Sequence, residues 1–112
     1  MATINVESFK SVDLIEVIGR IDSSTAPALD EALKQFTDNG RSKLVVDLAG
    51  VEYMSSAGLR ALVAALRTSR SRIGGDVRLA APSTRVKEVL DLAGLDALFQ
   101  QFDDRTAAVG SF

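Results

Sequence analysis

The order of sequence patterns along the chain predicts an α/β fold: one mixed sheet of four to five strands with helices packed on it. Strand-like and helix-like runs follow one another as β-β-α-β-α-β-α-β-α, and this alternation is typical of α/β domains. The first two strands are so close in sequence that they predict an antiparallel hairpin. Later strands are separated by helices, so their right-handed crossovers make them parallel. We expect a single domain over 1–112.

The first half of the chain predicts the hairpin and one helix. Residues 3–8 alternate between apolar and polar, and residues 12–18 form the second run, which ends at a glycine. Ser23 or Ser24 is the expected cap of the helix that follows, and Asn39-Gly40 closes it. The apolar positions of this helix fall at i, i+3, i+4 and i+7 and share one face: Leu29, Ala32, Leu33 and Phe36.

The middle of the chain predicts a central strand followed by a helix. Residues 43–48, KLVVDL, are almost continuously apolar, which is typical of a strand buried on both faces. A turn is expected over 49–52. A helix is expected over 57–72 and is stopped by Gly74-Gly75.

The last third predicts smaller elements. Residues 77–80 form another strand, Pro82-Ser83 opens a third helix, and Gly94 ends that helix. Residues 98–102 are expected to be a short edge strand. Residues 106–112 are expected to form a final helical turn or two.

The composition excludes several classes of function. The formal net charge is −2 with both signs interspersed, which gives no general attraction to nucleic acid or to an anionic membrane. Cysteine and histidine are both absent from the sequence. Disulfides, zinc sites built on Cys or His and a Ser-His-Asp triad are therefore excluded, and no cofactor is expected. The N-terminus lacks an apolar signal segment, and no apolar run is long enough to span a bilayer. We expect a cytoplasmic protein.

Residues 53–59, YMSSAGL, hold two adjacent serines between a strand and a helix. In one interpretation Ser55 or Ser56 is the N-cap, whose oxygen accepts a bond from a free backbone N–H one turn on. In the other, one hydroxyl is modified, since two serines exceed what one cap needs. A phosphate at a helix start is favoured by the exposed N–H groups and the helix dipole.

The outward face of the following helix carries small side chains. Leucines and valine gather on one side of this helix. The opposite side carries Ala57, Ala61, Ala64 and Thr68, flanked by Arg60, Arg67 and Ala65. Such a stripe can form a flat platform that another protein approaches closely. Alanine is also simply a good helix former, and both interpretations remain open.

The stretch VVDLAGVEYMSSAGLRALV resembles the signature of STAS domains, specifically the bacterial anti-sigma factor antagonists of the SpoIIAA-like class. GRID, residues 19–22, resembles the family's Gly-x-(Leu/Ile)-Asp, and residues 79–95 are similar to its last strand and helix. The resemblance covers nearly the whole chain. The positions that fit the central signature are Asp47-Leu48, Val51, Tyr53-Met54, Ser56 and Gly58-Leu59.

The resemblance implies a regulatory protein and not an enzyme. Members bind an anti-sigma serine kinase related to the histidine-kinase ATPase fold and thereby release a sigma factor. The kinase phosphorylates the motif serine, which a PP2C-type phosphatase restores. The implied acceptor is Ser56, with Ser55, which stands where the family often has Asp, as a secondary candidate. The implied partner surface is Asp22, Ser23, Ser55, Ser56, Ala57, Arg60, Ala61 and Ala64.

Three alternatives stay open. A small-ligand or nucleotide-binding module would use the glycines, although neither GxGxxG nor GxxxxGK[ST] occurs. Catalysis would need Asp22, Asp47 and the serines to act without histidine. Asp47 more simply caps the following turn, and Asp103-Asp104 is a solvated helix start. A STAS-like interaction module of another signalling or transport complex is the third. Exposed apolar residues at Leu98-Phe99 suggest a monomer or a weak dimer.

Overall fold

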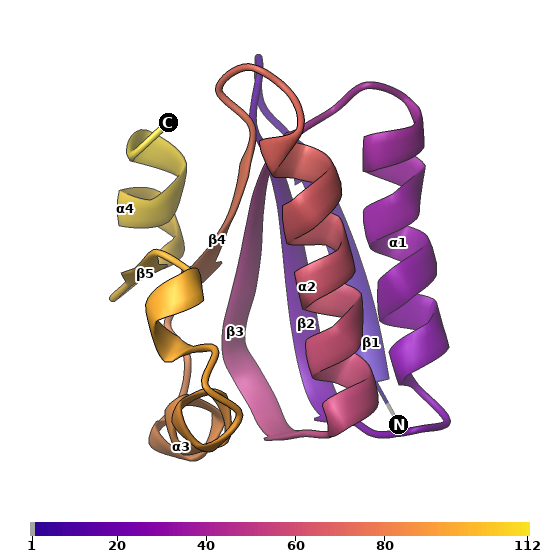
Figure 1. Cartoon of the computed structure of the whole chain (residues 1–112), viewed down its shortest axis with the longest axis vertical. Helices are drawn as coiled ribbons and strands as arrows, with labels where there is room; N and C mark the ends of the chain where they lie inside the picture. Colours follow the sequence, from indigo (N-terminus) through magenta and orange to yellow (C-terminus); the bar gives the residue numbers. More distant parts are fainter. Residues whose placement is uncertain (1) are drawn as a thin grey trace.

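The computed structural model describes residues 2–112, and its sheet has five strands in the order β1-β2-β3-β4-β5 (Figure 1). The domain expected over 1–112 differs from this range only in Met1, which lies outside the described residues. In chain order the elements are β1 (Ala2–Ser8), β2 (Asp13–Ile21), α1 (Ala26–Asp38), β3 (Lys43–Met54), α2 (Ser56–Arg70), β4 (Asp76–Ala80), α3 (Thr84–Leu92), the 3-10 turn η1 (Asp96–Leu98), β5 (Gln101–Phe102) and α4 (Arg105–Gly110).

The strand directions agree with the sequence. β1 and β2 pair antiparallel, while β3, β4 and β5 continue the sheet in parallel. The predicted α/β class and mixed sheet are therefore confirmed. The predicted edge strand at 98–102 is shorter than expected, because η1 takes up its beginning and only Gln101 and Phe102 join the sheet.

The two faces of the sheet are covered differently. α1, α2 and α3 pack on one face over the larger core, and α4 alone packs on the other. Figure 1 shows α1 and α2 running side by side along the sheet. The larger core includes Ile15, Val17, Leu29, Leu33, Leu62, Leu66, Val86 and Leu90, and the smaller one includes Val12, Leu14, Val45 and Ala108. In residues 2–112, no helix combines the length and apolar character that crossing a bilayer requires.

The expected turn over 49–52 is wrong, because β3 runs on to Met54. Its second half pairs with β2 beyond two irregularities in register, which place Ile18 beside Gly50 and Ile21 beside Met54. Gly19, with φ of 106°, adopts at one of these irregularities a conformation that side chains disfavour. The longer strand carries the two serines to the same edge of the sheet as the end of β2.

Two further expectations are corrected. Thr25, and neither Ser23 nor Ser24, stands at the N-cap position of α1, and its side chain makes no capping bond. Phe99 is buried in the larger core, so of the expected exposed pair Leu98-Phe99 only Leu98 is exposed.

α4 is fastened to the sheet by a charged cluster. Arg105 Nε donates to Asp47 Oδ2 at 2.8 Å, and its Nη2 contacts the carboxylate of Glu16. Asp47 also accepts from the Ala49 N–H at 3.0 Å, which confirms its predicted bond to the following backbone. Asp104 caps α4 by accepting from the Ala107 N–H, so its predicted place at a helix start is confirmed.

Candidate functional site

The candidate site lies where β2 and β3 end side by side. The Ser55 N–H donates to the Ile21 carbonyl oxygen at 2.8 Å. This bond joins the loop that begins at Asp22 to the start of α2. Because β2 and β3 are parallel, their carboxyl ends meet at one edge of the sheet. Asp22 and the serine pair, distant in sequence, therefore belong to one surface.

Gly58 allows α2 to start this close to the strands. A Cβ at this position would lie 2.6 Å from Ile21 Cγ2 and overlap the Met54 sulfur. Real Cβ atoms do not approach so closely, so any side chain here would push the helix start away from the sheet. The glycine of YMSSAGL is thus explained by packing.

The two serines have different environments. Ser55 is the N-cap of α2, and its Oγ accepts from the Gly58 N–H at 3.4 Å. Ser56 is the first residue of the helix and is exposed. Within residues 2–112 its hydroxyl makes no hydrogen bond in the structure. The capping interpretation is therefore confirmed for Ser55, which leaves the Ser56 hydroxyl free for a reagent.

Asp22 organises the loop beside the serines. Its Oδ1 accepts from Ser24 Oγ at 2.7 Å, from the Ser24 N–H at 3.0 Å and from the Thr25 N–H at 3.2 Å. Thr25 Oγ1 accepts from the Asp22 N–H and donates to the Arg20 carbonyl. The bonds from Ser24, followed by those from Thr25, lower the pKa of Asp22 to about 2. The site therefore carries a fixed negative charge at neutral pH.

A groove of about 400 Å³ runs between the starts of α1 and α2. It is lined by Ser23, Ala26, Pro27, Asp30, Ala57, Arg60, Ala61 and Ala64, which include much of the partner surface that the resemblance implies. Ala61 was expected on the outward face, and this expectation is wrong. The side chain of Ala61 is 6% exposed, because α1 packs across it. Ser23, Arg60 and Ala64 are exposed.

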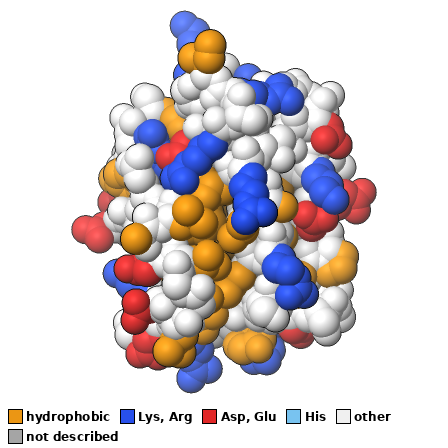
Figure 2. Space-filling view, viewed as in Figure 1, with side chains coloured by type: hydrophobic (Ala, Val, Ile, Leu, Met, Phe, Trp, Pro, Cys, Tyr) orange, Lys and Arg blue, Asp and Glu red, His pale blue; other side chains and the backbone are white. Residues whose placement is uncertain are grey.

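A second groove lies on the other side of α2, towards the end of α3. Its volume is about 580 Å³, and Figure 2 shows apolar side chains along this part of the surface with basic side chains beside them. The lining residues are Ser56, Leu59, Arg60, Val63, Ala64, Arg67, Ala93 and Leu95. Sequence reasoning missed this groove. Leu59 and Val63 were assigned to the core face, and nothing local placed Ala93 or Leu95 opposite them.

The described part of the chain, 2–112, contains no cluster of three or more Asp, Glu, His or Cys side chains that could hold a metal ion. Asp22 directs its bonds into its own loop, and Asp47 pairs with Arg105.

Comparison with known proteins shows what the chain as a whole is similar to. The family model of the STAS domain matches residues 3–108. The chain is 32% identical over 102 residues to the anti-sigma-F factor antagonist RsfB of Mycobacterium tuberculosis, covering 89% of this chain and 80% of RsfB.

Solved structures are also similar. An anti-sigma factor antagonist from Mycobacterium paratuberculosis matches with a TM-score of 0.84 and 29% identity, over 99% of this chain and 93% of that one. SpoIIAA in its unphosphorylated form matches with a TM-score of 0.82 over 96% of this chain and 93% of that one; at 16% identity this likeness concerns the fold. The match over residues 3–108 and the relative at 32% identity lead to one conclusion: the chain belongs to the STAS domain family.

Proposed function

We propose that this chain is an anti-sigma factor antagonist whose unmodified form binds an anti-sigma serine kinase in the cytoplasm, and that phosphorylation of Ser56 ends this binding. The observation that carries the proposal is the free, exposed hydroxyl of Ser56 beside the charged Asp22 loop. The relative RsfB is named an anti-sigma-F factor antagonist, which supports the partner class. The chain acts by binding and not by catalysis.

The division of work between the serines supports Ser56 as the acceptor. Ser55 Oγ caps α2, so modification there would remove a bond that the helix uses. The Ser56 hydroxyl makes no hydrogen bond within residues 2–112. A phosphate on Ser56 lies at the positive end of the helix dipole, where the helix tolerates it. Ser55 remains the secondary candidate.

The switch is electrostatic. A phosphate adds about −1.5 to −2 of charge, and it would do so on a surface that already carries the Asp22 carboxylate. A partner that packs on the unmodified surface would have to bury this charge, which is costly unless a cation matches it. Arg60, one turn further along α2, can offset only part of a charge of this size. A PP2C-type phosphatase would restore the unmodified state.

The test uses the purified chain with each anti-sigma serine kinase of its own organism, in the presence and absence of ATP. We expect one kinase to bind the chain and, with ATP, to phosphorylate it at Ser56, as mapped by mass spectrometry. Ser56→Ala should bind the kinase as the wild type does, and Ser56→Asp should bind at least about tenfold more weakly.

The outcomes separate the alternatives. Phosphate on Ser55 would keep the switch and move the acceptor. Stable binding of a partner without any phosphorylation would indicate an interaction module of another complex. If no kinase of the organism binds or modifies the chain, the proposal is wrong.

A further inference from the structure

We propose that the groove between α2 and the segment that follows α3 is a docking site for an acidic, amphipathic helix of a partner protein. That the partner is the anti-sigma factor rests on the proposed function. The chemistry of the groove rests on its own residues. The name α2 groove is used below for the site lined by Ser56, Leu59, Arg60, Val63, Ala64, Arg67, Ala93 and Leu95.

The floor of the α2 groove is apolar. Leu59 and Val63 come from α2, and Ala93 and Leu95 come from the chain after α3. Val63 and Leu95 are partly exposed, so the apolar floor of the groove is accessible to a binding partner. The groove has a volume of about 580 Å³.

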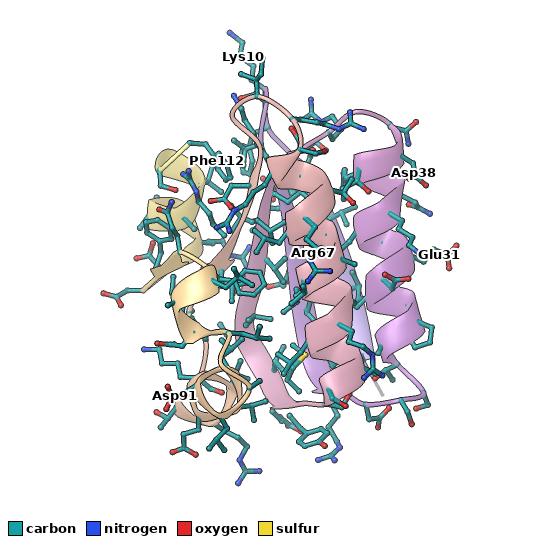
Figure 3. All side chains as sticks on the ribbon, viewed as in Figure 1. Lys10, Glu31, Asp38, Arg67, Asp91 and Phe112 are labelled. Atoms are coloured by element: carbon teal, nitrogen blue, oxygen red, sulfur yellow. The ribbon has the colours of Figure 1, made fainter. Side chains whose placement is uncertain are left out.

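The rim of the α2 groove carries two cations. Arg60 and Arg67 form no ion pair with any residue from 2 to 112, and both are exposed. Arg67 lies on the outer side of α2 in Figure 3. Among the described lining residues none is a carboxylate. The groove therefore combines an apolar floor with uncompensated positive charge, and this favours a negatively charged occupant.

Most of the other arginines have partners within the fold. Arg41, Arg70, Arg78 and Arg105 each hold an aspartate or glutamate of the fold. Arg20 stacks over the Tyr53 ring with a guanidinium-to-centroid distance of 4.7 Å. Arginines that stabilise this fold thus have partners within it. Arg60 and Arg67 have none, as is also true of Arg85 on α3, but only Arg60 and Arg67 stand together on the rim of an apolar groove.

The spacing of the two cations suggests the shape of the occupant. Arg60 and Arg67 are seven residues apart, so they lie on the same side of α2 about 10 Å apart along its axis. A helix lying along α2 can match this with acidic residues at i and i+7 and apolar residues at i+3 and i+4 between them. This is the arrangement of a helix in a groove.

The α2 groove also connects to the switch. Ser56 lies at one end of the groove, one helical turn before Arg60. A phosphate on Ser56 would compete with a partner carboxylate for the Arg60 guanidinium. Arg67 is three turns from Ser56. A substitution of Arg67 therefore tests docking in the groove without altering the surroundings of the Ser56 hydroxyl.

The first test uses two synthetic helical peptides and the isotope-labelled full chain. One peptide carries Glu at i and i+7 with Leu at i+3 and i+4, and the other has Lys in place of both Glu. We expect saturable shifts of the amide resonances of residues 59–67 and 93–95 with the Glu peptide. The Lys peptide should bind about tenfold more weakly or not at all.

Charge reversal sharpens the test. Arg67→Glu should weaken binding of the Glu peptide about tenfold and improve binding of the Lys peptide. Arg85→Glu is the matched control, because Arg85 is exposed on α3 and does not line the groove. The affinities of the Arg85→Glu variant for the Glu peptide and for the Lys peptide should equal those of the wild type.

The proposal is overturned by equal binding of both peptides, by resonance shifts outside residues 59–67 and 93–95, by no binding at about 1 mM, or by binding that Arg67→Glu leaves unchanged. Binding of phosphatidylserine vesicles by these residues, with no response to either peptide, would also overturn it.

A second measurement separates this inference from the proposed function. If an anti-sigma factor binds the wild type and Arg67→Glu equally well, the proposed function stands and the docking inference fails. If the Glu peptide binds the groove while no anti-sigma factor of the organism binds the chain, the docking site stands and the proposed function fails.

Discussion

The loops that lead into α1 and α2 lie next to each other but use their hydroxyl groups in different ways. Before α1, the hydroxyls of Ser24 and Thr25 are bonded within the loop, to Asp22 and to the Arg20 carbonyl. Before α2, Ser55 caps the helix, and Ser56 has no bonded partner in residues 2–112. The first loop bonds two of its three hydroxyls and leaves only the exposed Ser23 hydroxyl without a bond in residues 2–112, whereas the second ends on the free hydroxyl of Ser56 at the first position of the helix.

The difference teaches how to choose between neighbouring serines. Ser23, Ser24, Ser55 and Ser56 look alike in the sequence, and all lie near a helix start. Whether the fold already occupies the hydroxyl separates Ser24 and Ser55 from Ser56. Ser23 also has a free hydroxyl, and it differs from Ser56 in not lying at the first position of a helix. A serine whose Oγ stabilises the backbone resists modification because the modification costs stability. The free hydroxyl at Ser56 carries no such cost.

Gly58→Ala should cause the largest loss of stability, because it forces the loop that leads into α2 away from the loop that leads into α1. The new Cβ would meet Ile21 and Met54, and overpacking of this kind costs about 1–3 kcal/mol. Thermal or urea unfolding measures it. Gly110→Ala is the control, since a Cβ there meets nothing within 4 Å. Equal stability of the two variants would show that the junction is not tightly packed.

Ser55→Ala should have the next largest effect. It removes the cap of α2, and the free energy of unfolding should fall by about 0.5–2 kcal/mol, towards the low end because the bond is 3.4 Å long. Ser56→Ala should change it by less than about 0.5 kcal/mol. The pair is compared by urea unfolding under identical conditions. A larger loss for Ser56→Ala would reverse the assignment of cap and free hydroxyl.

The smallest expected effect concerns the charge of the Asp22 carboxylate in the loop that leads into α1. Because the pKa of Asp22 is about 2 in the folded chain and ordinarily 3.8, protonation favours the unfolded state. The stability from Asp22 is complete above pH 3.8 and is lost as the pH falls towards about 2. NMR titration of the carboxyl carbon should give a midpoint near 2, and Ser24→Ala should raise it. A wild-type midpoint at the ordinary value would mean that the loop bonds do not persist in solution.

Much of the fold followed from local patterns. The hairpin, the crossovers and the core faces of the helices depend on apolar spacing and chain direction, which the sequence carries directly. β3 was predicted too short, because Ala49 and Gly50 look like a turn when the pairing with β2 is unknown. The position of the strand end is set by a neighbour more than 30 residues away, and no local signal contains it.

The candidate site was predictable in part, for a similar reason. Asp22, Ser55 and Ser56 could be marked from motif and capping chemistry. Ala61 could not be placed, because alanine suits both an exposed helix and a close helix contact, and only the packing of α1 decides between them. The Arg105–Asp47 pair joins residues 58 positions apart. The α2 groove likewise depends on where α3 ends in space.

The bond from the Ser55 N–H to the Ile21 carbonyl, which joins the two loops, has a consequence for kinetics. The proposed partner would meet a surface that is already assembled, so little conformational entropy would be lost on binding and association would be governed by diffusion and orientation. A phosphate at Ser56 would then change chiefly how long the complex lasts. Residence time, measured by dissociation of a preformed complex, is the quantity in which this switch would be most visible.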